Sequence, residues 1–328
     1  MSDDFTKSHC EAYYCAFVIR ELCKFARLSI LAVSMAVISF LLPGCAGNPP
    51  HPLPFAQAEA NRSNERGVEA ARRGDMSAAV SAFDEAYRGY AAVEHYPGMV
   101  TALLNTARVS TGRGNFAAAR KALQKAQNVI GFVPSLTAEF SFEQAKLLLR
   151  EGKASEALAW GERALTSASE AAKGRMTNLL ADIVYRLGNR ERAVSLAANG
   201  LTLSKRAGDR QETANALRLL AELALKGGEM TMAESRFTEA LSIDKELAAG
   251  SKIAFDLQGL ARTAEKAGER EKAVVFWGRA ANVSMAGADR ACAVASLERI
   301  AEIHEQAGDT ASLLKVRTLI ADIIKNAQ

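Results

Sequence analysis

A glycine recurs along this chain at an almost constant interval. It stands at Gly74, Gly114, Gly152, Gly188, Gly228, Gly268 and Gly308, with spacings of 40, 38, 36, 40, 40 and 40 residues. Self-similarity with a period of about 20 to 50 residues is typical of repeat proteins, in which each unit buries its apolar face against the next copy. The chain is therefore predicted to fold as a stack of similar units.

Small residues keep fixed distances from these glycines. Such columns mark positions where two helices cross closely, because a larger side chain would push their axes apart. The seventh unit keeps the glycine but has Leu313 and Ile320 in two of these columns, which indicates a degenerate terminal cap. The columns lie five residues after the glycine (Ala79, Ala119, Ala157, Ala193, Ala233, Ala273), twelve after it (Ala86, Ala126, Ala164, Gly200, Ala240, Ala280) and seven before it (Gly67, Ala107, Ala145, Ala181, Ala221, Ala261, Ala301).

Each unit is predicted to be a helix–turn–helix. From Ser135 to Gln328 the chain has no proline, and it is 49% hydrophobic but only 6% aromatic, a composition that favours helix. The turn glycine ends the first helix in the left-handed conformation. The second helix then has an N-cap candidate in four units, namely Asp75, Asn115, Asn189 and Asp309. Glycines are also expected to end the second helices, at Gly131, Gly174, Gly208, Gly250 and Gly287.

These units resemble the tetratricopeptide repeat. The resemblance rests on the glycine turn, alanine five and twelve residues later, and a bulky residue nine later, as in Phe83, Leu123, Phe237 and Trp277. It implies an all-α fold, a right-handed α-solenoid of about seven units over residues 56–328. Two features depart from the family. Its usual unit has about 34 residues, whereas the turn glycines here are 36 to 40 residues apart. The family's proline at the end of the second helix is also absent here.

In that family the first helices line a concave face that binds peptides or helices. Leu104, Phe142, Arg108 and Lys146 would form an apolar and basic patch, which suits an acidic, partly apolar segment; the alternative is an ordinary solvated face. The offsets ten and six residues before each glycine give the candidate groove residues Leu104, Arg108, Phe142, Lys146, Asn178, Asp182, Arg218, Gln258 and Arg262, with Asn64, Val68, Glu222, Glu298 and Glu302 in the same rows.

The N-terminal part is predicted to be a secretory signal. The run Leu28–Leu42 has fifteen uncharged residues after Lys24 and Arg27, and as a helix it would reach roughly 22 Å, short of a bilayer core of about 30 Å. A basic flank followed by a short apolar core is the plan of a signal peptide. An alternative start near Val18 or Leu22 would shorten its unusually long leading segment.

The motif Leu42-Pro43-Gly44-Cys45 resembles the lipobox of bacterial lipoproteins, although Pro43 is unusual there. The resemblance implies cleavage between Gly44 and Cys45, a diacylglycerol on the Cys45 sulfur and acylation of its new amino group, with palmitate-type chains. Ala46 then favours the outer membrane, facing the periplasm, in a bacterium with two membranes. The alternative is an uncleaved signal anchor with an incidental cysteine. The expected organisation is a signal peptide over 1–44, a proline-rich tether over 45–55 and the solenoid over 56–328.

Motifs for catalysis, metals or nucleic acids are missing from the sequence. It has four histidines and no CxxC, GxSxG or Walker glycine loop. The net charge of +4 is well mixed in sign, unlike the clustered Lys and Arg of a nucleic-acid footprint. We therefore expect neither an enzyme nor a cofactor or metal protein, and no nucleic-acid partner.

The expected function is a lipid-anchored scaffold, adaptor or assembly factor of the cell envelope. Its partners would be proteins or peptides of a secretion, pilus, outer-membrane assembly or cell-wall complex. The alternative is a membrane-anchored sensor or regulatory domain that faces the cytoplasm; a lipid on Cys45 would exclude it. Self-association through the solenoid ends is compatible with either.

Overall fold

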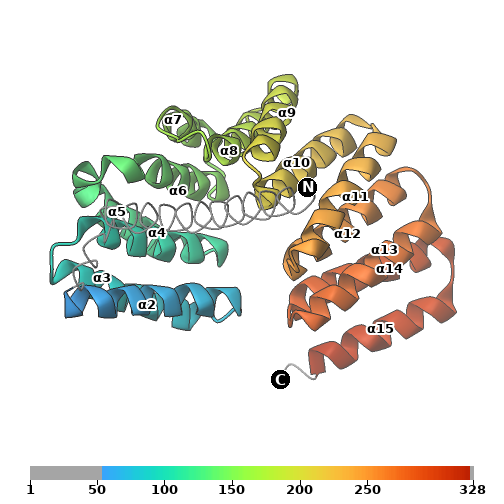
Figure 1. Ribbon diagram of the computed structural model, residues 1–328. Coiled ribbons are helices and arrows are strands. Elements are labelled where there is room, and N and C mark those ends of the chain that lie inside the picture. Colours follow the sequence, from blue (N-terminus) through green and yellow to red (C-terminus); the bar gives the residue numbers. More distant parts are fainter. Residues whose placement is uncertain (1–53, 326–328) are drawn as a thin grey trace, which may run out of the picture. The chain divides into compact units, whose positions relative to one another are not determined.

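A computed structural model describes residues 54–325, so the predicted signal peptide, Cys45 and the tether up to Leu53 lie outside the described residues. Within residues 54–325 the chain forms fourteen α-helices and two short 3-10 helices, with no strand (Figure 1). None of these helices is long and apolar enough to cross a membrane.

The helices form seven pairs, each joined by one of the recurring glycines. The pairs are α2 (Phe55–Arg72) with α3 (Met76–Ala91), α4 (Tyr96–Gly112) with α5 (Phe116–Val129), α6 (Thr137–Arg150) with α7 (Ala154–Thr166), α8 (Lys173–Arg186) with α9 (Arg190–Arg206), α10 (Arg210–Gly227) with α11 (Met230–Glu246), α12 (Gly250–Lys266) with α13 (Arg270–Ala286), and α14 (Arg290–Ala307) with α15 (Thr310–Lys325). The 3-10 helices η1 (Ile130–Phe132) and η2 (Pro134–Leu136) connect α5 to α6. The predicted α-solenoid of seven helix–turn–helix units is confirmed.

The stack curves with its first helices on the inner side. Each helix packs against its neighbours in sequence, and the first helices of successive repeats, such as α4 and α6 or α8 and α10, also contact one another. Figure 1 shows the inner position of the first helices most clearly at the middle of the row, where α7 and α9 lie on the outer side of α8 and α10. One surface is therefore built by consecutive first helices alone.

The glycine turns have the predicted geometry. All seven turn glycines have a left-handed φ, between 71° and 87°, a region that residues with a Cβ adopt only at a cost. The four predicted N-caps are also confirmed: the Oδ1 atoms of Asp75, Asn115, Asn189 and Asp309 each accept a hydrogen bond from the backbone N–H three residues later, at 3.0 to 3.2 Å. Local chemistry thus sets where each second helix begins.

Of the five glycines expected to end second helices, Gly287 caps α13 and Gly208 lies two residues beyond α9, whereas Gly131, Gly174 and Gly250 lie in η1, α8 and α12. Gly208 alone among them has a left-handed φ, and at three other exits the left-handed residue is Glu94, Ala248 or Ala288. Gly174 instead lies inside α8, where an added Cβ would come within 2.9 Å of the Ser204 backbone nitrogen. Its smallness is needed for close helix packing and not for a turn.

The columns of small residues form the helix contacts. The alanines five and twelve residues after the turn glycine are fully buried in the first six repeats, and Gly200 is buried in the same column. Bulky residues fill the space beside them: Phe83 and Phe237 are buried, and a Cβ on Gly67 or Gly259 would lie within 2.5 Å of one of their rings. The core is therefore a continuous row of small–large contacts along the stack.

Helix α15 ends the stack, as predicted for a terminal cap. It packs against α14, and Ile323 is its one buried residue. Its outward side is not polar, because Leu314 is 69% exposed and Ile324 50% exposed. The last repeat thus leaves apolar surface at the end of the solenoid.

Candidate protein-binding surface

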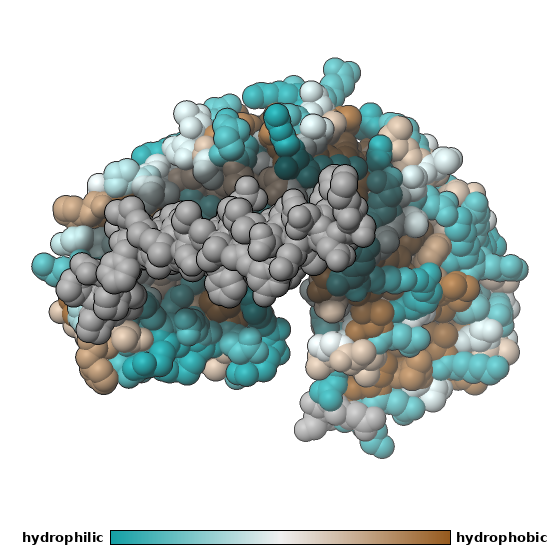
Figure 2. Space-filling view, viewed as in Figure 1, coloured by the Kyte–Doolittle hydropathy of each residue, from teal (hydrophilic) through white to brown (hydrophobic). Residues whose placement is uncertain are grey.

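Three rows of side chains form the inner surface of the first helices. They stand thirteen, ten and six residues before each turn glycine, and residues three or four apart share one side of a helix. We call this surface the inner face. Figure 2 shows a gap between the two ends of the described unit, and hydrophilic and hydrophobic residues are interspersed over the part of the surface that is visible.

The predicted groove residues do not all reach this surface. Leu104 is 4% exposed and belongs to a core cluster with Leu123 and Phe140, and Asn178 is 7% exposed, so neither presents its side chain to solvent. The other seven are half-buried or exposed: Arg108, Phe142, Lys146, Asp182, Arg218, Gln258 and Arg262. Whether they hold a ligand stays a prediction.

Many inner-face side chains bind the first helix of the adjacent repeat. Arg108 Nε donates to Glu143 Oε1 at 2.8 Å, from α4 to α6. Such bonds lock the register between repeats and neutralise much of the charge that sequence reasoning assigned to a ligand. The same kind of bond joins Asn105 to Asn64, Arg175 to Glu139, Asn178 to Glu212, Arg218 to Asp256, Arg262 to Glu222, Gln258 to Ser296 and Arg299 to Glu265.

The predicted apolar and basic patch in repeats two and three is smaller than expected. Leu104 is in the core, and the charge of Arg108 is balanced by Glu143, which is itself buried. The Arg175 guanidinium lies 4.6 Å from the centre of the Phe142 ring, so a cation covers part of this aromatic surface. Lys146 remains half-buried beside these groups.

An exposed aromatic residue that sequence reasoning missed lies on α12. Phe255 is 42% exposed, and the guanidinium carbons of Arg218 and Arg262 lie 5.8 and 5.9 Å from its ring centre. It stands thirteen residues before Gly268, one helical turn before the row that lies ten residues before each glycine. Extending the rows by one turn would have found it, together with Arg175 and Asn215.

Buried and half-buried charged groups lie beside Phe255. Lys252 Nζ donates to Asn215 Oδ1 at 2.7 Å, and burial together with the nearby Arg218 charge lowers the pKa of Lys252. Burial raises the pKa of Asp256 to about 7, against the opposing effect of Arg218, whose Nε donates to Asp256 Oδ1 at 2.7 Å. The inner face at repeats five and six thus combines an exposed aromatic ring with partly desolvated charges.

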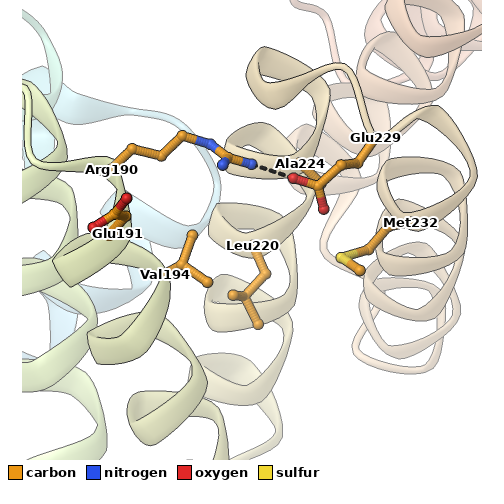
Figure 3. A pocket seen from close by; sticks show the side chains of 7 residues that line it. All are labelled: Arg190, Glu191, Val194, Leu220, Ala224, Glu229 and Met232. Atoms are coloured by element: carbon orange, nitrogen blue, oxygen red, sulfur yellow. Dashed lines mark hydrogen bonds and ion pairs between the residues drawn. The ribbon is translucent and has the colours of Figure 1, made fainter.

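A separate pocket of about 300 Å³ lies between repeats four and five, away from the inner-face rows (Figure 3). Val194, Leu220, Ala224 and Met232 supply its apolar lining. An Arg190–Glu229 ion pair crosses one side, and Arg190 Nε also donates to the Leu223 carbonyl at 3.2 Å. Arg190 therefore serves mainly to tie α9 to the end of α10.

Within residues 54–325 no group of three or more His, Cys, Asp or Glu side chains is placed to hold a metal ion. Cys292 is a free thiol that accepts a hydrogen bond from Gln258 Nε2 at 3.2 Å. The surface chemistry of the described residues is thus that of ion pairs, amides and exposed apolar groups.

Comparison with known proteins agrees with this architecture. Residues 172–246, which span α8 to α11, match the tetratricopeptide repeat family. No curated protein matches the sequence.

Solved structures with a similar fold include tetratricopeptide and signalling proteins. A Rap protein complexed with Competence and Sporulation Factor has a TM-score of 0.60 at 12% identity, over 81% of this chain and 76% of that one. A signal transduction ATPase with a tetratricopeptide repeat sensor, from Pyrococcus horikoshii, has a TM-score of 0.58 at 15% identity, over 82% and 43%. PilW, a type IV pilus biogenesis factor, has a TM-score of 0.50 at 18% identity, over 67% and 91%. At such low identities these likenesses show the fold.

Proposed function

We propose that this chain is a non-catalytic scaffold that holds a segment of another protein against the inner face, and that Cys45 anchors it in the cell envelope. The fold supports the first part, because a tetratricopeptide-like solenoid provides a protein-binding surface without a catalytic centre. A partner of this kind binds by laying an extended or helical segment along successive first helices.

Phe255 is the observation that carries the proposal. Fully burying a phenylalanine side chain is worth roughly 1.5 to 3 kcal/mol, so an aromatic ring left 42% exposed on an otherwise ion-paired surface marks a place where a partner gains affinity. Arg218 and Arg262 flank the ring with cation–π contacts, and both guanidinium groups are already paired with carboxylates of neighbouring helices. The partner segment therefore places an apolar side chain on Phe255.

The class of partner is an assembly of the envelope: secretion, pilus, outer-membrane assembly or cell-wall enzymes. One protein of similar fold, PilW, is described as a pilus biogenesis factor, and another, the Rap protein, was crystallised with Competence and Sporulation Factor. They are precedents for a scaffold role of this fold.

The proposed location in the cell envelope is supported by the sequence alone. A basic flank, the short apolar run Leu28–Leu42 and the lipobox-like Leu42–Cys45 together favour lipid attachment, with the outer membrane and the periplasmic side as the proposed location. The test is metabolic labelling with a palmitate analogue, followed by fractionation. Wild type takes up label and stays with the membranes, whereas Cys45→Ser does neither; equal labelling of both proteins would refute the anchor.

The binding face is tested by site-specific photo-cross-linking in cells. A photoreactive phenylalanine derivative replaces Phe255 in one strain and, as a matched control, replaces Phe132 in another; Phe132 is 67% exposed but lies in η1, outside the inner face. We expect discrete protein adducts from position 255 and none of the same identity from position 132. Identical adducts at both positions would contradict an inner-face site. If all adducts contained cytoplasmic proteins, the hypothesis of a cytoplasmic sensor would be favoured over that of an envelope scaffold.

A further inference from the structure

Two buried aspartates meet one arginine at the joint between repeats five and six. Asp244 on α11 and Asp256 on α12 are both fully buried, and Arg218 on α10 is 12% exposed. Arg218 Nε donates to Asp256 Oδ1 at 2.7 Å, and its Nη2 reaches both Asp244 Oδ2 and Asp256 Oδ2, the latter at 3.3 Å. Two carboxyl groups thus share a single guanidinium nitrogen.

This cluster is peculiar to one joint of the described stack. Ser204 and Ser284 occupy the position of Asp244 in repeats four and six, and Ala216 and Met176 occupy that of Asp256 in repeats five and four; all four are buried. The fold therefore needs only a small or apolar residue at these places. The two carboxyl groups are an addition to the repeat framework and not part of it.

Arg218 is the one positive group among the described residues that forms ion pairs with the two carboxyl groups. Arg218 from α10 supplies one positive charge in contact, and Asp244 Oδ1 is buried with no hydrogen-bond partner. Lys252 on α12 bonds Asn215, and its charge is attracted by Asp244, Glu212 and Asp256, while burial and Arg218 lower its pKa. From the other side of α12, α14 reaches Gln258 through the uncharged Ser296 and Cys292, and the Arg299–Glu265 pair lies near the far end of α12. Two like charges buried side by side are strongly unfavourable unless one is protonated.

We propose that the joint between repeats five and six is proton-linked: one proton held by the Asp244–Asp256 pair keeps α10, α11 and α12 closed, and its loss loosens this joint. With the proton, one carboxyl donates to the other and the remaining negative charge faces Arg218. Without it, two buried anions repel and draw water between α11 and α12. Because this joint lies beneath Phe255 on α12, its loosening changes the relative placement of the repeats on either side.

The direction of the pH effect follows from linkage. The pKa of Asp256 is raised in the folded joint to about 7, whereas an opened, hydrated aspartate has the ordinary value of 3.8. Between these values the closed joint binds one proton more than the open one, so closure is strongest at low pH and weakens as pH rises. The opening equilibrium is expected to increase by up to about tenfold per pH unit in this window, and to level off above about pH 7.

Hydrogen exchange of the full chain tests the proposal. After correction for intrinsic rates, peptides from α11 and α12 in wild type should open more with each step from about pH 5 to about pH 7. Asp256→Asn, which cannot ionise, should remove this slope. Glu222→Gln is the matched control, because Glu222 also crosses from α10 to α12, to Arg262, but is partly exposed; it should keep the slope.

Two results would overturn the proton-linked joint: protection of α11 and α12 that is independent of pH in wild type, or a slope that survives in Asp256→Asn. If that variant fails to fold by circular dichroism, infrared spectroscopy of wild type with ¹³C-labelled aspartates decides. A band from a protonated carboxyl that disappears as pH is raised through about 7 supports the proposal, and no such band above about pH 6 refutes it. None of these measurements depends on the binding partner.

Discussion

At the scale of single residues, three non-glycine residues with left-handed φ stand out. Glu94, Ala248 and Ala288 have φ of 50°, 51° and 58° at exits from second helices. A Cβ makes this conformation unfavourable by roughly 1 to 2 kcal/mol. The turn glycines avoid this cost, whereas these exits retain it, so the joints between repeats store strain that the turns within repeats do not.

Replacing Ala248 by glycine should stabilise the protein by about 1 kcal/mol, because the left-handed backbone no longer opposes a Cβ. Ala267→Gly is the control: Ala267 is also exposed and follows a helix, but its φ is −79°. That variant should lose up to about 1 kcal/mol through added freedom of the unfolded chain. Urea unfolding followed by circular dichroism measures the free energy of unfolding of both variants. A loss of stability in Ala248→Gly would contradict the proposed backbone strain at Ala248.

At the scale of helices, glycine acts differently depending on what it faces. A Cβ on Gly259 of α12 would lie 2.4 Å from the Phe237 ring, whereas the nearest atom to a Cβ on Gly278 of α13 is Ile300 Cδ1 at 4.0 Å. Gly259 is needed for a close helix contact, whereas Gly278 has room for a side chain. Sequence inspection does not distinguish them, since both lie in helical patterns.

Gly259→Ala is therefore expected to destabilise by about 1 to 3 kcal/mol through overpacking, and Gly278→Ala to stabilise by up to about 1 kcal/mol through helix propensity. Thermal unfolding of the two variants checks the opposite signs. Combining Gly259→Ala with Phe237→Leu should recover part of the loss, and a Gly259→Ala protein as stable as wild type would disprove the proposed close contact.

Ion pairs between adjacent repeats also differ by burial. Arg218 serves two fully buried carboxyl groups, whereas Arg299 and its partner Glu265 are both partly exposed. Arg218→Met should cost about 3 to 5 kcal/mol at neutral pH, since it leaves buried charge without a partner. Arg299→Met should cost at most about 1 kcal/mol.

Chemical denaturation at two pH values measures this difference. The Arg218→Met deficit should shrink as pH falls, because the raised pKa of Asp256 lets this carboxyl group take up a proton and lose its charge. Equal losses in the two variants, or an Arg218→Met deficit that grows in acid, would contradict the burial argument.

At the scale of the whole molecule, stability is distributed along the stack. In a solenoid each repeat is held by its neighbours only, so the ends open more easily than the middle. Helix α15 contacts α14 and buries a single side chain, Ile323. By contrast α10 has contacts with α8, α9, α11 and α12.

Hydrogen exchange should therefore be fastest in α15 and slowest in α8 to α12 at low pH. The physical reason is the number of neighbours that must separate before an amide is exposed. Mass spectrometry of peptides from the full chain gives this profile. Protection of α15 equal to that of α10 would contradict the prediction and indicate that the exposed Leu314 and Ile324 are covered in solution, as self-association through the solenoid ends would do.

The sequence by itself determined the number of repeats, their boundaries and their internal packing. These depend on local chemistry: a glycine that takes a left-handed φ, an Asp75 or Asn115 side chain that caps the next helix, and small residues one helical face apart. Such interactions act within a few residues, or within one helix pair, and therefore leave a period in the sequence.

Only the tertiary structure decided which polar side chains remain available on the inner face. Arg108 and Gln258, predicted as groove residues, bond Glu143 and Ser296 on the next first helix, and Leu104 lies in the core. Phe255, one turn from the predicted rows, is exposed. These outcomes depend on the small rotation between successive repeats and on which long side chains it brings within reach. That rotation is set by packing summed over whole helices, so no local sequence pattern records it.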